Sequence, residues 1–237
     1  MAARHSTVSG FVTGDYLAPT GARLAGQRVV AVAYLVRHPE ATLLFDTGFP
    51  FDEPFTVEEG DDPVPTFPRS LVDSLARLRT SIGQLDLVAN CHLHIDHAGG
   101  NFRLPPTLPI HVQATELTEA RREEEQLVVD ALAIDSRAYV PVEGEAEILP
   151  GIRTFPTPGH TAGHQSLLVD TADGTVVLLG QGMPSASEFA AATYAAQLEA
   201  EGSVPVPAYP AWLPRLLELR PVQVRFAHDL ATWQRGA

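Results

Sequence analysis

Lysine is missing from this sequence altogether. All 16 basic residues are arginine, and they stand against 29 aspartate and glutamate residues, which gives the 237-residue chain a formal net charge of −13. The absence of lysine excludes Schiff-base chemistry and the phosphate-binding P-loop, since both need its amine. The arginines form no basic stripe, and a surface this acidic repels phosphate groups. We therefore expect no nucleic-acid partner and no binding to an anionic membrane.

Cysteine and long apolar runs are equally scarce. Cys91 is the single cysteine, so no internal disulfide can form and an oxidising compartment is not indicated. The sequence has no run of about 18 apolar residues, and its first residues lack the apolar stretch of a signal peptide. These features predict a cytoplasmic protein.

The length of the chain sets a further bound. A protein of this size buries roughly 70% of the surface that its unfolded form exposes, so neither a disulfide nor a metal is needed to hold its core together. We expect a single domain over residues 1–237, and we expect any bound metal to serve function.

Short apolar strands and helices alternate along the chain, twice over. Strands are predicted at residues 28–37, 41–45, 85–89, 109–113, 148–155, 166–170, 175–179 and 222–226, and helices at 70–78, 115–132, 187–201 and 211–219. Residues 50–68 are rich in Pro, Gly and acids, which favours a loop, either a lid or a passive surface loop. The pattern predicts two sheets covered by helices on their outer faces.

Three of the nine histidines fall within six residues, in the sequence HLHIDHAGGN. In an extended stretch His92 and His94 project to the same side and can bind one ion together. Where the chain then turns, Asp96 and His97 point elsewhere and can serve a second ion. Neutral imidazole and carboxylate suit zinc, and iron or manganese with less preference. The cluster therefore predicts a metal site without fixing the metal.

Two further histidines stand where later strands end. His160 lies in the sequence TPGHTAGH after one predicted strand, and His228 lies just past the last one, at positions where ligands often collect. With the cluster they suffice for two sites of three protein ligands, each with a position open for water, which is catalytic geometry. His164 is expected to support its loop. No function is assigned to His5, His38 and His111.

The order of these motifs resembles the metallo-β-lactamase superfamily. The stretch from His92 to Gly100 matches the family together with Asp46-Thr47-Gly48 upstream and Gly159-His160-Thr161 and His228-Asp229 downstream. The resemblance implies an α+β fold, the four-layer αββα sandwich. Within the superfamily the chain looks most like N-acyl homoserine lactonases and their relatives, on the stretches HLHIDHAGGN, PIHVQATE and EILPGIRTFPTPGHTAGHQSLLV. This resemblance implies a small-molecule substrate with a lactone or ester carbonyl.

One position departs from the family. Where members usually carry an aspartate that bridges both metals, after the predicted strand 175–179, this chain reads Gly180-Gln181-Gly182. A carboxylate offers two oxygens and offsets one positive charge, whereas an amide offers one neutral oxygen. We expect two ions to bind, but more weakly. The alternative is that Gln181 is a loop residue one position away from the true counterpart.

The resemblance also implies a mechanism. A metal-activated hydroxide attacks a carbonyl that the metal polarises, with one or two Zn²⁺ ions, or Fe or Mn instead. Asp96 is the expected catalytic residue, orienting the water and passing a proton to the leaving alkoxide. Asp46 is expected to accept a hydrogen bond from a ligand imidazole or from backbone, or else only to cap a strand end. The implied metal ligands are His92, His94, Asp96, His97, His160, Gln181 and His228.

Two alternatives to a hydrolase stay open. A mononuclear iron dioxygenase acting on persulfides would use His92, His94 or His160 and tolerate an altered bridge. A non-catalytic metal-binding or regulatory module with the same fold would explain Gln181. The sequence leaves the oligomeric state undetermined.

The expected substrate is small, neutral and partly apolar. The segments 50–68 and 187–201 are the available pocket walls. Their aromatic residues could line the pocket or, equally, belong to the core: Phe51, Phe55, Phe67, Phe189 and Tyr194.

Overall fold

The computed structural model describes residues 5–19, 25–59, 62–122 and 126–236, and its strands fall into two sheets. The first sheet contains β1 (Thr7–Leu17), β2 (Arg28–Arg37), β3 (Thr42–Phe45), β4 (Phe55–Glu59), β5 (Asp62–Pro68), β6 (Leu87–Ala89), β7 (Pro109–Gln113) and β8 (Ala138–Val142). The second contains β9 (Glu147–Leu149), β10 (Ile152–Pro156), β11 (Gln165–Thr171), β12 (Gly174–Leu178), β13 (Gln223–Arg225) and β14 (Trp233–Gln234). The helices are α1 (Leu71–Arg77), α2 (Ile95–Ala98), α3 (Ala114–Ala120), α4 (Gln126–Leu132), α5 (Ala186–Ala200) and α6 (Leu213–Glu218), with 3-10 turns η1 (Ile82–Gln84), η2 (Asn101–Arg103) and η3 (Ile134–Ser136).

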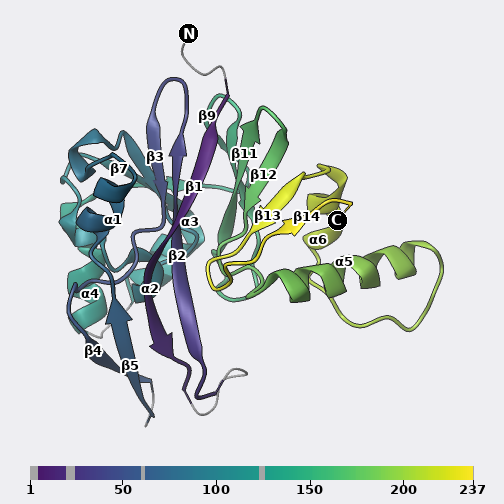
Figure 1. Ribbon diagram of the computed structural model, residues 1–237, viewed down its shortest axis with the longest axis horizontal. Helices are drawn as coiled ribbons and strands as arrows, with labels where there is room; N and C mark the ends of the chain where they lie inside the picture. Colours follow the sequence, from purple (N-terminus) through teal and green to yellow (C-terminus); the bar gives the residue numbers. More distant parts are fainter. Residues whose placement is uncertain (1–4, 20–24, 60–61, 123–125, 237) are drawn as a thin grey trace.

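The two sheets pack face to face between layers of helices (Figure 1). The strand orders are β4-β5-β1-β2-β3-β6-β7-β8 and β14-β13-β12-β11-β10-β9. Helices α1 and α4 lie on one outer face of the sandwich, and α5 and α6 lie on the other (Figure 1). The predicted α+β, four-layer αββα sandwich is confirmed. Within the described ranges, no helix combines the length and apolar character needed to cross a membrane.

The central strands have continuous apolar sequences because both of their faces are buried, as β2 illustrates. Val32, Tyr34 and Val36 face the core between the two sheets, whereas Ala33 and Leu35 face the layer that contains α1. A strand covered on both sides buries both of its faces, so it loses the alternation of a half-exposed strand. The same holds for β11 and β12, whose outward residues meet α5 and α6.

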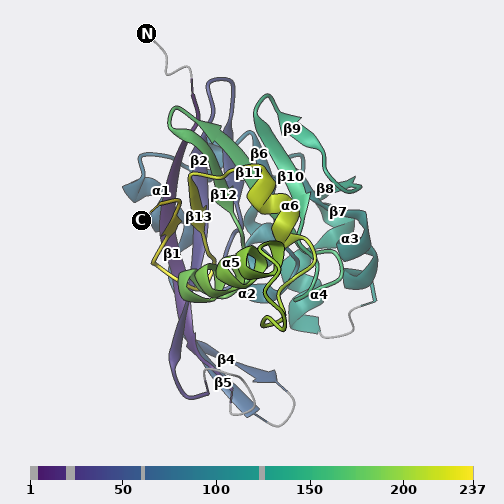
Figure 2. The same ribbon diagram turned by 90° about the vertical axis from the view of Figure 1, so that its right-hand side faces the viewer.

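The segment 50–68 was expected to be a loop, and that expectation is wrong. Strands β4 and β5 pair antiparallel, and β5 continues the first sheet by pairing with β1, where Asp15 lies opposite Phe67. The hairpin projects from the body of the molecule (Figure 2). Pro63 and Pro65 are tolerated because they lie beyond the stretch that pairs with β1, where a missing N–H costs no bond to that strand.

Two other predicted elements are each divided in the structure. The predicted helix 115–132 is two helices, α3 and α4: α3 ends at Ala120, and Arg121 and Arg122, which offer no apolar side chain to the core, form a turn. The predicted strand 148–155 is β9 and β10, which pair with each other around a turn at Pro150-Gly151. Gly151 has a φ of 75°, which glycine adopts without strain. Strands β1, β8 and β14 were not predicted. The expected N-cap of α1 is confirmed, since Ser70 Oγ accepts the Asp73 N–H.

Candidate metal centre

The first histidine cluster joins the two sheets. His92 and His94 follow β6 of the first sheet, and His160 lies between β10 and β11 of the second. Ligand atoms of all three lie within 4.8 Å of one another, and His94 Nδ1 is 3.0 Å from His160 Nε2. His92 is fully buried, whereas His94 and His160 are open to a cavity. The three rings could hold one ion, which a molecule in the cavity lined by His94 and His160 would be able to reach.

The second cluster lies beside the first. Its residues are Asp96 and His97 on α2 and His228 after β13. His97 Nε2 is 3.3 Å from Asp96 Oδ2 and 3.3 Å from His228 Nε2, and His228 Nε2 is 3.6 Å from Asp96 Oδ2. Gln181, three residues after β12, places its Oε1 3.1 Å from His97 Nε2. The amide oxygen therefore faces the second cluster instead of lying away in a loop.

The structure thus brings together all of the residues that the sequence predicted as ligands: His92, His94, Asp96, His97, His160, Gln181 and His228.

The atoms of the site fit a metal ion. His92 Nε2 is buried and has no hydrogen-bond partner among the described residues. Leaving such a group unpaired costs roughly 1–3 kcal/mol, so the atom is oriented for a ligand from outside the chain. Burial, together with the nearby histidines, lowers the pKa of His92 well below its usual range, which keeps the ring neutral as metal binding requires. Imidazole nitrogens and one carboxylate are the donors that divalent transition metals prefer.

The carboxylate of Asp96 is held in its charged form. Burial alone raises the pKa of Asp96, but His97, and after it His228 and His94, outweigh that effect and hold the pKa well below its usual range. Burial by contrast lowers the pKa of His97, yet the carboxylates of Asp96 and Asp46 raise it well above its usual range. Only a neutral imidazole offers a lone pair, so His97 would have to lose this proton to serve as a ligand of the second cluster.

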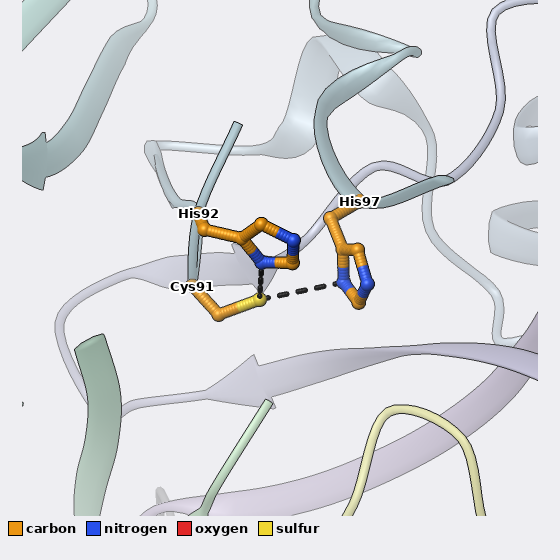
Figure 3. A group of neighbouring side chains, drawn as sticks. All are labelled: Cys91, His92 and His97. Carbon is orange, nitrogen blue, oxygen red and sulfur yellow. Dashed lines mark hydrogen bonds between the residues drawn. The ribbon is translucent and has the colours of Figure 1, made fainter. Parts of the chain in front are cut away.

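Cys91 and Asp46 are buried and contact histidines of the two clusters. Cys91 Sγ lies 3.1 Å from His92 Nδ1 and 3.3 Å from His97 Nδ1 (Figure 3), and 3.0 Å from Asp46 Oδ2. Burial, with the charge of Asp46, raises the pKa of the Cys91 thiol to about 12. The thiol thus stays protonated and acts as a hydrogen-bonding group, although its position beside two histidines is one from which cysteine can also bind metals. Only its place directly before His92 signals this role in the sequence.

Asp46 orients His97. Its Oδ2 lies 3.0 Å from His97 Nδ1, and its Oδ1 accepts the Cys91 N–H at 2.8 Å. A carboxylate that accepts the Nδ1 hydrogen leaves the Nε2 lone pair of a neutral ring for a ligand. The contact agrees with the expected support of a ligand imidazole.

Asp46→Asn is expected to weaken binding of an ion at the second cluster by about 10- to 100-fold. The amide oxygen can keep the Cys91 N–H, but its NH₂ group then meets His97 Nδ1 and favours the wrong tautomer. Asn tolerates the left-handed φ of 66° at this position, so backbone strain does not contribute. Metal titration after chelation measures the change, with Asp52→Asn, an exposed ion-pair partner of Arg103, as control. Unchanged affinity in Asp46→Asn would show that the contact does not tune the ligand.

A cavity of about 440 Å³ opens onto both clusters. Tyr16 and Val29 from the central strands, Val57 and Val64 from the β4–β5 hairpin, and Pro184 before α5 make up much of its apolar wall. The size is that of a small-molecule site. The polar and charged residues that also line it are His94, Asp96, His160, Gln181, Glu188 and His228.

The five aromatic residues proposed for this wall lie elsewhere. Phe189 is fully buried against the second sheet, and Tyr194 is 62% exposed on α5. Phe51 and Phe55 pack edge to face with each other at 5.0 Å, and Phe67 lies beneath the Arg28 guanidinium. The two segments do reach the cavity, but through residues that sequence reasoning did not select, because the hairpin register decides which side chains face it.

The remaining histidines stay outside the two clusters. His164 is buried, lies 2.8 Å from Thr157 Oγ1 and accepts the Gln181 N–H at 3.1 Å, so it supports the loop that carries Gln181. Burial lowers its pKa to about 3, which keeps it a neutral acceptor. His5, His38 and His111 belong to neither cluster.

The two clusters lie next to each other where the two sheets meet. An αββα sandwich with such a pair of histidine and carboxylate clusters belongs to the class of metal-binding proteins. The sequence profile of the Metallo-beta-lactamase superfamily matches residues 26–230, and the chain belongs to this superfamily. An N-acyl homoserine lactonase from Bacillus sp is 37% identical over 155 residues, which are 62% of this chain and 60% of that protein. The N-acyl homoserine lactonase AiiA from Bacillus thuringiensis subsp. kurstaki is 36% identical over 155 residues, with the same coverage. The chain thus matches 60% of the length of these curated relatives.

A solved structure extends the likeness to nearly the whole chain. A B. thuringiensis AiiA variant with N-decanoyl-L-homoserine bound at its active site has a TM-score of 0.74 and 25% identity, covering 97% of this chain and 95% of the other. The fold of the complete sandwich, including the strands outside the matched sequence, is therefore shared.

Proposed function

We propose that this protein is a metal-dependent hydrolase that opens a lactone or ester carbonyl, with N-acyl homoserine lactones as the first substrate class to test. The observation that carries the proposal is the pair of ligand clusters at the floor of a cavity with an apolar wall. The names of the relatives, N-acyl homoserine lactonases, support the substrate class.

The residues divide the work between holding ions and handling protons. His92, His94 and His160 would hold one ion, and Asp96, His97, His228 and Gln181 the other. A metal bound there would polarise the carbonyl and lower the pKa of a water, so that hydroxide is available to attack near neutral pH. Asp96 faces the cavity and is 17% exposed, so its carboxylate can orient that water and pass its proton to the leaving oxygen. The apolar wall would hold the acyl part of the substrate.

Zn²⁺ is the proposed resident metal, with Fe and Mn as alternatives, because three-histidine and histidine–carboxylate sets suit zinc best. A single domain over residues 1–237 remains part of the proposal, supported by the shared core between the two sheets. The cytoplasm remains a prediction from the sequence.

Removal of metal is expected to abolish hydrolysis reversibly. The purified chain is analysed for metal, dialysed against a chelator and assayed on N-acyl homoserine lactones, aryl esters, thioesters and β-lactams. We expect activity on lactones or esters to fall more than about 100-fold on chelation and to return with Zn²⁺. Activity that survives in metal-free protein contradicts the proposal. Oxygen consumption with a persulfide but no hydrolysis would support the dioxygenase, and metal binding without turnover would support a regulatory module.

A further inference from the structure

The first cluster depends on the distance between two loops that belong to different sheets. His92 and His94 lie on the loop after β6, and His160 lies on the loop between β10 and β11. His94 and His160 are both exposed, so packing against the core does not fix their separation. A contact close to the three histidines is therefore needed to keep the two loops at a fixed distance from each other.

Glu116 contacts both loops with one side chain. It lies on α3 and is only 5% exposed. Its Oε1 accepts the Leu93 N–H at 3.0 Å, and its Oε2 accepts the Thr161 hydroxyl at 2.6 Å. Leu93 stands between His92 and His94 in the chain, and Thr161 is the residue next to His160. Each carboxylate oxygen of Glu116 therefore binds a residue that is adjacent in sequence to a proposed ligand.

We propose that Glu116 is a positioning residue for the first cluster: its carboxylate sets the spacing between His92 and His94 on one loop and His160 on the other. This inference rests on the proposed metal centre. A carboxylate suits the role because both of its oxygens accept, which an amide cannot match.

The surroundings of α3 keep Glu116 in place. A Cβ at Gly163 would lie 2.3 Å from the Glu116 backbone nitrogen, so the loop that carries His160 packs directly on the start of α3. Besides the contact between His94 and His160 themselves, two bonds join the ends of the strands that carry the loops: the Gln165 N–H donates to the Cys91 carbonyl at 2.8 Å, and Gln165 Nε2 donates to the Asn90 carbonyl at 2.8 Å. Those bonds hold the base of the loops, whereas Glu116 acts at the level of the histidines.

Metal binding to the first cluster alone provides the test. The full chain in a His228→Ala background, which disables the second cluster, is chelated and titrated with Co²⁺, whose visible absorption reports the geometry of its ligands. We expect Glu116→Ala to weaken Co²⁺ binding by about 10- to 100-fold and to change the absorption spectrum. Glu116→Gln, which keeps one acceptor and the shape, should recover part of the affinity.

Thr161→Val isolates one arm of the contact. It is isosteric, removes the hydroxyl from Glu116 Oε2, and should weaken Co²⁺ binding less than Glu116→Ala. Added to Glu116→Ala it should cause little further loss, because both variants remove the same bond. Thr118→Val is the matched control, since its hydroxyl donates to the Ala114 carbonyl on the same helix and touches neither loop. It should bind Co²⁺ like the background protein.

The outcomes separate this inference from the proposed function. Co²⁺ affinity and spectrum unchanged in Glu116→Ala, with only the melting temperature lowered, would reduce Glu116 to an anchor of α3 and overturn the inference. If Glu116→Ala does not fold, Thr161→Val decides: unchanged Co²⁺ binding in that variant overturns the inference. A His228→Ala protein that binds no Co²⁺ while the unsubstituted chain does overturns the assignment of an independent first site, and with it this inference. Absence of binding in both would instead overturn the metal centre and the proposed function.

Discussion

His92→Ala is expected to lower the hydrolytic kcat/KM more than about 100-fold, beyond the loss typical of changes to groups that only orient a ligand. The ring is fully buried, and its Nε2 has no partner among the described residues, so this atom is available to bind an ion. Without this nitrogen the first cluster keeps two exposed histidines. Assays on the best lactone or ester, with metal analysis of the same sample, measure the effect.

His94→Ala separates loss of the site from loss of the fold. His94 is exposed, so its removal leaves no cavity in the core, yet it should abolish turnover to a similar degree. Circular dichroism should show an unchanged fold in His94→Ala. His38→Ala, a histidine outside both clusters that lies against the Pro150 carbonyl, serves as control and should retain full activity. Full activity in either ligand variant would end the metallohydrolase interpretation.

Gln181→Asp is expected to raise the metal occupancy of the second cluster, so that the chain approaches a total of two bound ions. The Gln181 amide oxygen lies 3.1 Å from His97 Nε2, beside Asp96 and His228, but it carries no charge. Two divalent ions held close together repel each other, and a carboxylate at this position offsets part of that repulsion. The unsubstituted protein should therefore hold less than one ion in its second site. Metal titration of both proteins after chelation measures the difference, and activity should rise if both ions take part.

Gln181→Glu is the matched control for reach. Aspartate is one methylene shorter than glutamine, whereas glutamate places a carboxylate oxygen where the amide oxygen now lies. A gain in Gln181→Glu alone would mean that charge is needed but the shorter side chain cannot reach. If the unsubstituted protein already holds two tightly bound ions, and neither variant changes occupancy or rate, then Gln181 does not act at a bridge.

The local parts of this protein could be predicted from its sequence. The i, i+2 spacing of His92 and His94 places two rings on one side of an extended stretch whatever the rest of the chain does. Strand β2 could be predicted from its apolar run, and the start of α1 from its capping serine, because both signals depend only on residues close by in the sequence. These signals, together with the resemblance to the superfamily, sufficed for the layered fold and for the proposed ligands.

Tertiary structure alone decided how these parts meet. Asp46 and His97 are 51 residues apart, Glu116 and Thr161 are 45 apart, and His97 and His228 are 131 apart. Such pairs are set by strand order and by register, which a single sequence does not encode in any local period. The hairpin of β4 and β5 shows the same limit: Val57 and Val64 lie opposite each other and line the cavity, whereas Phe67 lies on the other face of β5 from Val64 and does not, and a shift of one residue in pairing would exchange the two faces.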